Sequence, residues 1–186
     1  VEYIQSSGAQ WIKTGKGFGG NDEFIIDIAF TNTTGSLYFG CYANSSFKLY
    51  PVSRIGARIG YSTGTKQYYS VDSLVVNQKY SFHTFAKSGA SYQIVDGVTK
   101  PTQTETFSTN TRELFLFGEN DSTQSTPYAL GSARLYRYAH KQNGVLVLDL
   151  VPCYRKADNV AGMYDLVTHA FYTNAGSGSF VVGPNV

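Results

Sequence analysis

Two carboxyl groups near the start of the chain have a spacing that could support acid–base chemistry. Glu23 and Asp27 enclose the run Glu-Phe-Ile-Ile-Asp, and because side chains of a strand alternate between its faces, Glu23, Ile25 and Asp27 would share one face. Hydrolysis of a glycosidic bond needs two carboxyl groups beside the scissile bond, one as acid and one as base or nucleophile. No further acid follows in Ile28–Asn32. We therefore interpret Asp27 as either a strand-edge residue or a hydrogen-bonded one, and we expect no enzyme. A divergent glycoside hydrolase is the third functional hypothesis.

Metal chemistry has less support in the sequence. The three histidines are far apart and form no closely spaced ligand pair, so we expect no transition-metal site. The loop Gly118–Ser122 is rich in oxygen atoms, and Glu119, Asn120 and Asp121 are candidate calcium ligands. The favoured interpretation is that these are solvated turn residues. Calcium is the one cofactor that the sequence leaves open.

Saccharide recognition is suggested by the aromatic content, which includes 15 Tyr and 12 Phe. The C–H faces of sugars stack on exposed rings, while flanking polar groups bind the hydroxyls. Tyr68 and Tyr69 are adjacent, so they point to opposite faces of a strand and one should be exposed. Tyr50 is a further aromatic candidate. The predicted ligand-binding residues are Tyr68, Tyr69, Trp11, Tyr42, Asn44, Arg58, Tyr61 and Asn120.

Roughly a dozen short strands separated by turns must position these side chains. Asp96-Gly97 between two extended runs predicts a hairpin, and Arg54–Tyr61 is expected as one alternating strand. Residues 150–180 predict three strands separated by turns. Within that stretch Arg155, Asp158 and Asp165 could bind a ligand, although a local network that pins the hairpin is favoured. No helix is convincing, so we predict an all-β fold: a single domain, residues 1–186, built as a two-sheet antiparallel β-sandwich.

Composition excludes other classes of function. The net charge is +2 with no basic block, so we expect no nucleic-acid partner. No apolar run approaches the roughly 18 residues of a membrane span, so we expect no membrane insertion. The chain starts at Val1 rather than Met, which suggests a piece of a larger multidomain or virion protein. Cys41 and Cys153 could pair, but two separate thiols are favoured.

Several runs carry a resemblance to a known family. They are Tyr92-Gln-Ile-Val-Asp-Gly97 and Gly131-Ser-Ala-Arg-Leu-Tyr-Arg-Tyr138. They resemble strands of the concanavalin A-like lectin/glucanase superfamily, and more narrowly of the laminin-G-like jelly rolls. The opening residues 2–15 and the closing runs 151–156, 162–165 and 171–176 are similar to modules of gut bacterial surface and phage tail proteins.

The resemblance implies a jelly roll that recognises a ligand rather than reacting with it. Our leading hypothesis is a non-catalytic, glycan-binding module that is extracellular, on a cell surface or virion, with a glycan or cell-surface glycoprotein as its partner. The alternative is a protein–protein adhesion or structural module that uses the same edges and loops. Laminarinase-type members of the superfamily carry a third acid on the strand; here Ile25 stands where the central acid belongs.

Overall fold

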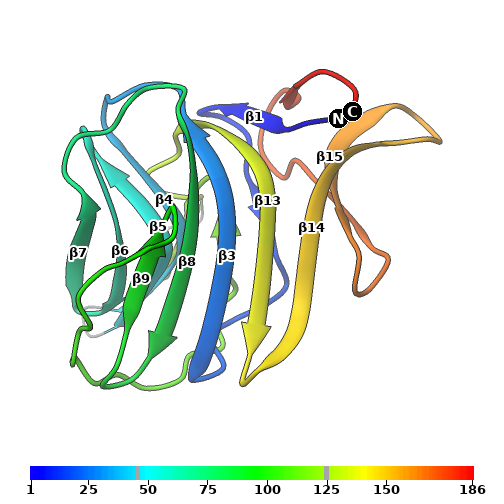
Figure 1. The fold of residues 1–186 in the computed structure, drawn as a ribbon. Coiled ribbons are helices and arrows are strands. Elements are labelled where there is room, and N and C mark those ends of the chain that lie inside the picture. Colours follow the sequence, from blue (N-terminus) through cyan, green and yellow to red (C-terminus); the bar gives the residue numbers. More distant parts are fainter. Residues whose placement is uncertain (45–46, 124–125) are drawn as a thin grey trace.

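Alternating apolar and polar residues build the larger of two layers, an antiparallel sheet (Figure 1). The protein is described by a computed structural model that covers residues 1–44, 47–123 and 126–186. In the central strand, Phe24, Ile26 and Ile28 point into the core and the residues between them point outward. The strands of this sheet, in spatial order, are β10 (Val98–Thr99), β9 (Tyr92–Val95), β8 (Lys79–Lys87), β3 (Asn21–Phe30), β13 (Ser132–Gln142), β14 (Val145–Arg155), β15 (Val160–Asp165) and β16 (Phe171–Thr173), with β1 (Ile4–Ser7) beside β13 and β17 (Val181–Val182) beside β1.

The smaller sheet packs against the larger one and is the layer that carries the site. In Figure 1 its strands β4–β7 lie behind and to the left of β8 and β3. Side chains from both sheets form one hydrophobic core between the layers. The strands of the smaller sheet are β2 (Ile12–Lys13), β11 (Phe115–Leu116), β4 (Ser36–Asn44), β5 (Phe47–Ile55), β6 (Arg58–Gly64) and β7 (Lys66–Val71), and β12 (Glu119–Asp121) pairs with β4. The predicted fold class is confirmed, with one exception: β12 runs parallel to β4.

Turn chemistry fixes where the strands reverse. Asp96 and Gly97 both have positive φ, 48° and 82°, and they connect β9 to β10 as the sequence predicted. The single strand expected over residues 54–61 is wrong, because Gly56 adopts φ 58° and turns β5 into β6. The guanidinium of Arg54, which is 1% exposed, holds this turn by donating to the carbonyl oxygens of Thr34 and Gly56 at 2.8 and 3.0 Å.

The C-terminal stretch forms the three predicted strands, β14, β15 and β16. Arg155 and Asp158 form an exposed ion pair across the β14–β15 turn, at 2.9 Å between Nε and Oδ1. Asp165 is fully buried and its carboxylate accepts the backbone N–H groups of Asp149, Val167 and Thr168. This part of the chain is therefore a structural network, as the favoured interpretation predicted.

The two chain ends lie side by side (Figure 1). The N–H of Glu2 donates to the carbonyl of Pro184 at 2.8 Å, and the N–H of Gly183 donates to Tyr3 at 3.0 Å. The sulfur atoms of Cys41 and Cys153 are both free thiols. The described residues include no helix long and apolar enough to cross a membrane.

Candidate functional site

The outer face of the smaller sheet carries a row of tyrosines. In β4, Leu37, Phe39 and Cys41 belong to the core, so Tyr38 and Tyr42, which alternate with them along the strand, project outward. A pocket of about 500 Å³ opens on this face. We call it the tyrosine pocket, and it is lined by Tyr38, Tyr42, Lys48, Tyr50, Ile55, Gln67, Glu119, Asp121 and Tyr128.

The aromatic wall of the tyrosine pocket is preorganised. The rings of Tyr38 and Tyr50 are parallel to within 5°, with centroids 4.6 Å apart, an arrangement that adds about 0.5–1.5 kcal/mol beyond the buried area. Gly40 stands between Tyr38 and Tyr42 at a bulge in β4, where a Cβ atom would come 1.9 Å from the carbonyl oxygen of Leu49. Only glycine therefore allows the strand geometry that carries these rings.

Two acids reach the same pocket from β12. Glu119 and Asp121 are two residues apart on a strand, so they share a face. Glu119 is 3% exposed, and burial raises its pKa to about 7. The charge of Asp121 also raises this pKa, while a hydrogen bond from the Tyr50 hydroxyl and the charge of Lys48 offset part of the rise. Glu119 is thus a carboxyl group that changes its charge near neutral pH.

The mouth of the pocket is formed by Tyr128, which is 51% exposed. Its backbone makes two hydrogen bonds to the backbone of Glu119, at 2.8 and 3.0 Å. At the opposite side, Gln67 donates to Ser53 Oγ at 2.7 Å and accepts a hydrogen bond from Ser62. The backbone of Tyr128 is therefore anchored to β12, and the side chain of Gln67 is held by two serines outside the pocket lining.

Three of the residues predicted from the sequence lie on this outer face. Tyr42 lines the tyrosine pocket itself. Tyr69 shares its strand face with Gln67 and is 38% exposed, which confirms that one residue of the Tyr68-Tyr69 pair is exposed. The guanidinium of Arg58 stacks 3.7 Å from the centroid of the Tyr69 ring and pairs with Asp72 at 2.9 Å.

The other predicted residues lie elsewhere. Tyr61 is 1% exposed and its hydroxyl donates to the carbonyl of Ser91, so its ring offers no face to an outside ligand and this part of the prediction is wrong. Tyr68 packs on Tyr61 and donates to Glu105 at 3.2 Å. The half-buried ring of Trp11 lies against Phe115, with centroids 4.5 Å apart.

Asn44 and Asn120 line a different, strongly polar pocket of about 440 Å³ together with Arg112 and Glu113. The amide oxygen of Asn120 accepts from Arg112 at 2.7 Å, and its nitrogen donates to the Glu113 carbonyl at 2.8 Å. Asn120 is thus a tether for this loop, on the side of β12 away from the tyrosine pocket.

The proposed calcium ligands do not converge. Glu119 and Asp121 face the tyrosine pocket, whereas Asn120 points to the opposite side of the strand. These residues are not solvated turn residues either, because Glu119 and Asp121 are 3% and 8% exposed in a paired strand. Over the described ranges, no group of three or more acidic, histidine or cysteine side chains could hold a metal ion.

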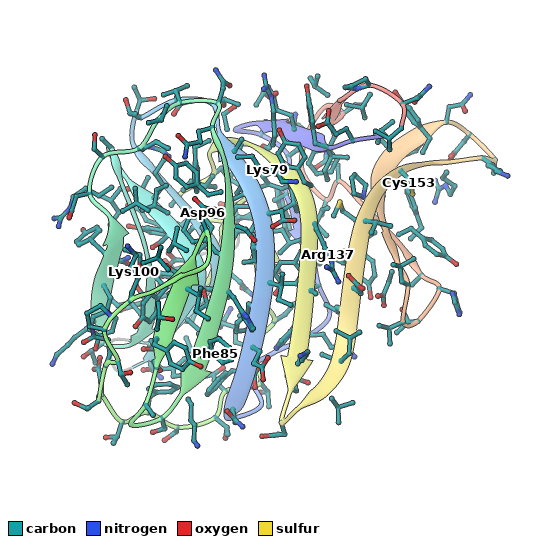
Figure 2. All side chains as sticks on the ribbon, in the orientation of Figure 1. Lys79, Phe85, Asp96, Lys100, Arg137 and Cys153 are labelled. Atoms are coloured by element: carbon teal, nitrogen blue, oxygen red, sulfur yellow. The ribbon has the colours of Figure 1, made fainter. Side chains whose placement is uncertain are left out.

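The carboxyl groups of Glu23 and Asp27 share the outer face of the larger sheet, as their spacing predicted. Each has a cationic or titratable neighbour: Glu23 lies 3.2 Å from His83 and 3.3 Å from Lys141, and Asp27 lies 3.9 Å from Lys79. Figure 2 labels Lys79 along this sheet. These acids therefore belong to a charged, open surface.

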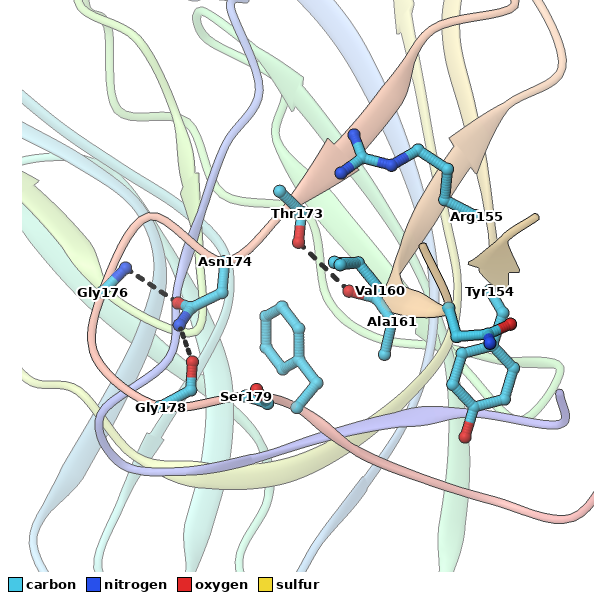
Figure 3. A pocket seen from close by; sticks show the side chains of 11 residues that line it. Tyr154, Arg155, Val160, Ala161, Thr173, Asn174, Gly176, Gly178 and Ser179 are labelled. Atoms are coloured by element: carbon cyan, nitrogen blue, oxygen red, sulfur yellow. Dashed lines mark hydrogen bonds between the residues drawn. The ribbon is translucent and has the colours of Figure 1, made fainter. Parts of the chain in front are cut away.

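A further pocket of about 470 Å³ lies between the C-terminal hairpin and the closing loop (Figure 3). Three of its polar side chains are already engaged. Arg155 pairs with Asp158, the Thr173 hydroxyl donates to the Ala161 carbonyl, and Asn174 bonds Gly176 and Gly178. The tyrosine pocket differs from this one in its lining, which combines parallel tyrosine rings with two carboxyl groups.

Of the four tyrosines that line the pocket, Tyr42 and Tyr50 were candidates from the sequence, whereas Tyr38 and Tyr128 were missed. Tyr38, Glu119 and Tyr128 were not placed in a binding site together with Tyr42. One signal was available, since Tyr38-x-Gly40-x-Tyr42 alternates and puts both rings on one face. No pattern in the sequence indicated that β12 would pair with β4 and bring Glu119 to this pocket.

Comparison with known proteins identifies the fold. No protein-family model matches the chain, and no curated protein matches it. Among solved structures, domains LG4-5 of the mouse laminin alpha1 chain match 90% of this chain with a TM-score of 0.59 and 14% identity. An alginate lyase, AlgAT5 from polysaccharide lyase family 7, matches 70% of this chain and 62% of its own, with a TM-score of 0.44 and 11% identity. This chain spans about half, 48%, of the laminin chain. The chain thus has the β-sandwich fold of laminin LG domains, which is the fold that the sequence resemblance implied.

Proposed function

We propose that the protein is a non-catalytic recognition module that binds a glycan in the tyrosine pocket. The observation that carries the proposal is the composition of this pocket: parallel tyrosine rings beside carboxyl, amide and ammonium groups in a concave site. Rings bind the C–H faces of a sugar and the polar groups bind its hydroxyls. The fold itself is shared by proteins of different activities, so the argument rests on the site.

The same proposal includes the setting of the module. We propose that the module is extracellular, on a cell surface or virion, with a glycan or glycoprotein as its partner and as part of a larger multidomain or virion protein. The sequence resemblance favours a bacterial surface or phage tail protein. A protein partner is the second candidate, favoured by the adjacent, exposed Val145 and Leu146 at the start of β14.

Glycan-array binding followed by calorimetry with the best glycan tests the proposal. Tyr128→Ala should weaken binding about 5- to 30-fold, because a sugar that loses its stacking ring forfeits on the order of 1–2 kcal/mol. Tyr154→Ala is the matched control, since Tyr154 is also exposed, at 42%, but lines the C-terminal pocket. A wild-type protein that binds no glycan, or a Tyr128→Ala variant that binds as the wild type does, would reject the proposal.

A further inference from the structure

The tyrosine pocket contains more negative than positive charge. Glu119 and Asp121 line it with Lys48 as the cation. The Oδ1 atom of Asp121 accepts hydrogen bonds from the backbone N–H and the hydroxyl of Thr123, both at 2.8 Å. Among the described residues, the Oε2 atom of Glu119 is buried and has no hydrogen-bond partner. A buried carboxylate with an unmatched oxygen is costly unless a cation or a donor completes it.

The aromatic lining of the pocket also favours a cation. The face of a tyrosine ring carries negative partial charge and attracts a cation within about 6 Å of its centroid. Four tyrosines line the pocket around the two acids. Rings and carboxylates together form a setting for an ammonium group, whereas a uronic or sialic acid would meet like charge.

We infer that the tyrosine pocket binds an ammonium group on its ligand, an amino sugar within the glycan, next to Glu119 and Asp121. The inference rests on the proposed function, because it names the sugar chemistry that the same pocket selects. Lys48 would oppose such a ligand, so its removal should strengthen binding of an ammonium and weaken binding of an anion. Opposite changes in the affinities for a cation and for an anion would directly test which charge the pocket prefers in its ligand.

The inference also couples binding to pH. An ammonium favours the ionised form of Glu119, so binding should release a proton and tighten as the pH rises. With a pKa of about 7 for Glu119, the ionised fraction grows about tenfold between pH 6 and pH 8. The groups that face Glu119 from β4, β5, β12 and the following loop are Tyr38, Tyr42, Lys48, Tyr50, Asp121 and Tyr128, with Cys41 beneath them.

The first experiment compares four probes at pH 7 and constant ionic strength. They are hexamers of glucosamine, N-acetylglucosamine and glucose, and choline as a permanently charged ammonium. For the wild type, the glucosamine hexamer should bind about tenfold more tightly than the other two hexamers. Glu119→Gln should remove this preference, and Lys48→Ala should enlarge it.

The second experiment follows choline by NMR titration from pH 6 to pH 8. Choline has no titratable group in this range, so about tenfold tightening that disappears in Glu119→Gln supports the inference. Equal binding of all three hexamers, with loss in Tyr128→Ala, would overturn the inference and leave the proposed function intact. Choline binding without any hexamer binding would reject the glycan proposal and retain the ammonium site. No dependence of choline binding on Glu119 would refute the ammonium site.

Discussion

Replacing Glu119 by Gln should make the protein more stable at pH 8 and leave its stability near pH 4.5 unchanged. Glu119 is 3% exposed, and burial raises its pKa in the folded protein to about 7, against 4.5 for an unperturbed glutamate. The folded state therefore holds this proton more tightly than the unfolded chain does. A shift of about 2.5 units at 1.36 kcal/mol per unit gives about 3 kcal/mol as the full effect.

The sign of the effect follows from this linkage. Below about pH 4.5 the carboxyl group is protonated in both states and costs nothing extra. Between pH 4.5 and 7 the unfolded chain ionises first, so the contribution of Glu119 to stability falls as the pH rises, and above pH 7 the whole cost remains. An amide at this position does not ionise, so Glu119→Gln should exceed the wild type by up to about 3 kcal/mol at pH 8.

Urea unfolding at half-unit steps from pH 4.5 to 8, followed by the fluorescence of Trp11, measures this difference. Trp11 is the one tryptophan of the chain and packs on Phe115. Glu2→Gln, which removes an exposed carboxyl group, is the control and should run parallel to the wild type. A Glu119→Gln difference that is flat across the pH range would refute the reasoning, because a carboxyl group that titrates alike in both states is not the buried group described above.

Two further predictions concern the scaffold. Asp165→Asn should cost about 2–3 kcal/mol at pH 7, because the carboxylate holds three backbone N–H groups. The pKa of Asp165 lies below its usual range, so this stabilisation is present above about pH 4 and is lost as the pH falls through the folded pKa. Urea unfolding should therefore show a smaller destabilisation by Asp165→Asn at pH 3 than at pH 7. An equal destabilisation at both pH values would contradict the prediction. Gly60→Ala should destabilise the protein by more than about 3 kcal/mol, since the added Cβ would lie 1.8 Å from the Tyr68 carbonyl oxygen. A variant with the melting temperature of the wild type would contradict this prediction, because it would show that the backbone at the β6–β7 bulge moves to accommodate the Cβ.

Local pattern was enough to predict most of the long strands and many of the turns. The Asp96-Gly97 turn and the alternation in β3 and β13 depend on residues that are close in sequence. Gly56 shows where such reasoning fails. Its run alternates as a strand should, but the turn is held by Arg54 bonded to the distant carbonyls of Thr34 and Gly35.

The candidate site was only partly predictable. Tyr42 and Tyr69 were expected to be exposed ligand-binding residues and lie on the outer face of the smaller sheet. Tyr61 was also predicted to bind a ligand, as one more tyrosine in an alternating run, but it is buried. Alternation assigns a residue to one face of a strand without saying which face packs against the other sheet.

The amino-acid sequence by itself determined an all-β sandwich, the hairpins of its C-terminal stretch and its wealth of tyrosine. The tertiary structure decided where the chemistry lies. It placed β12 parallel to β4, a contact between segments about 80 residues apart, and so moved Glu119 from an expected solvated turn to a buried wall beside Tyr50. The physical reason is that periodicity is a property of neighbouring residues, while the burial of a carboxyl group and the resulting pKa depend on which distant strands pack around it.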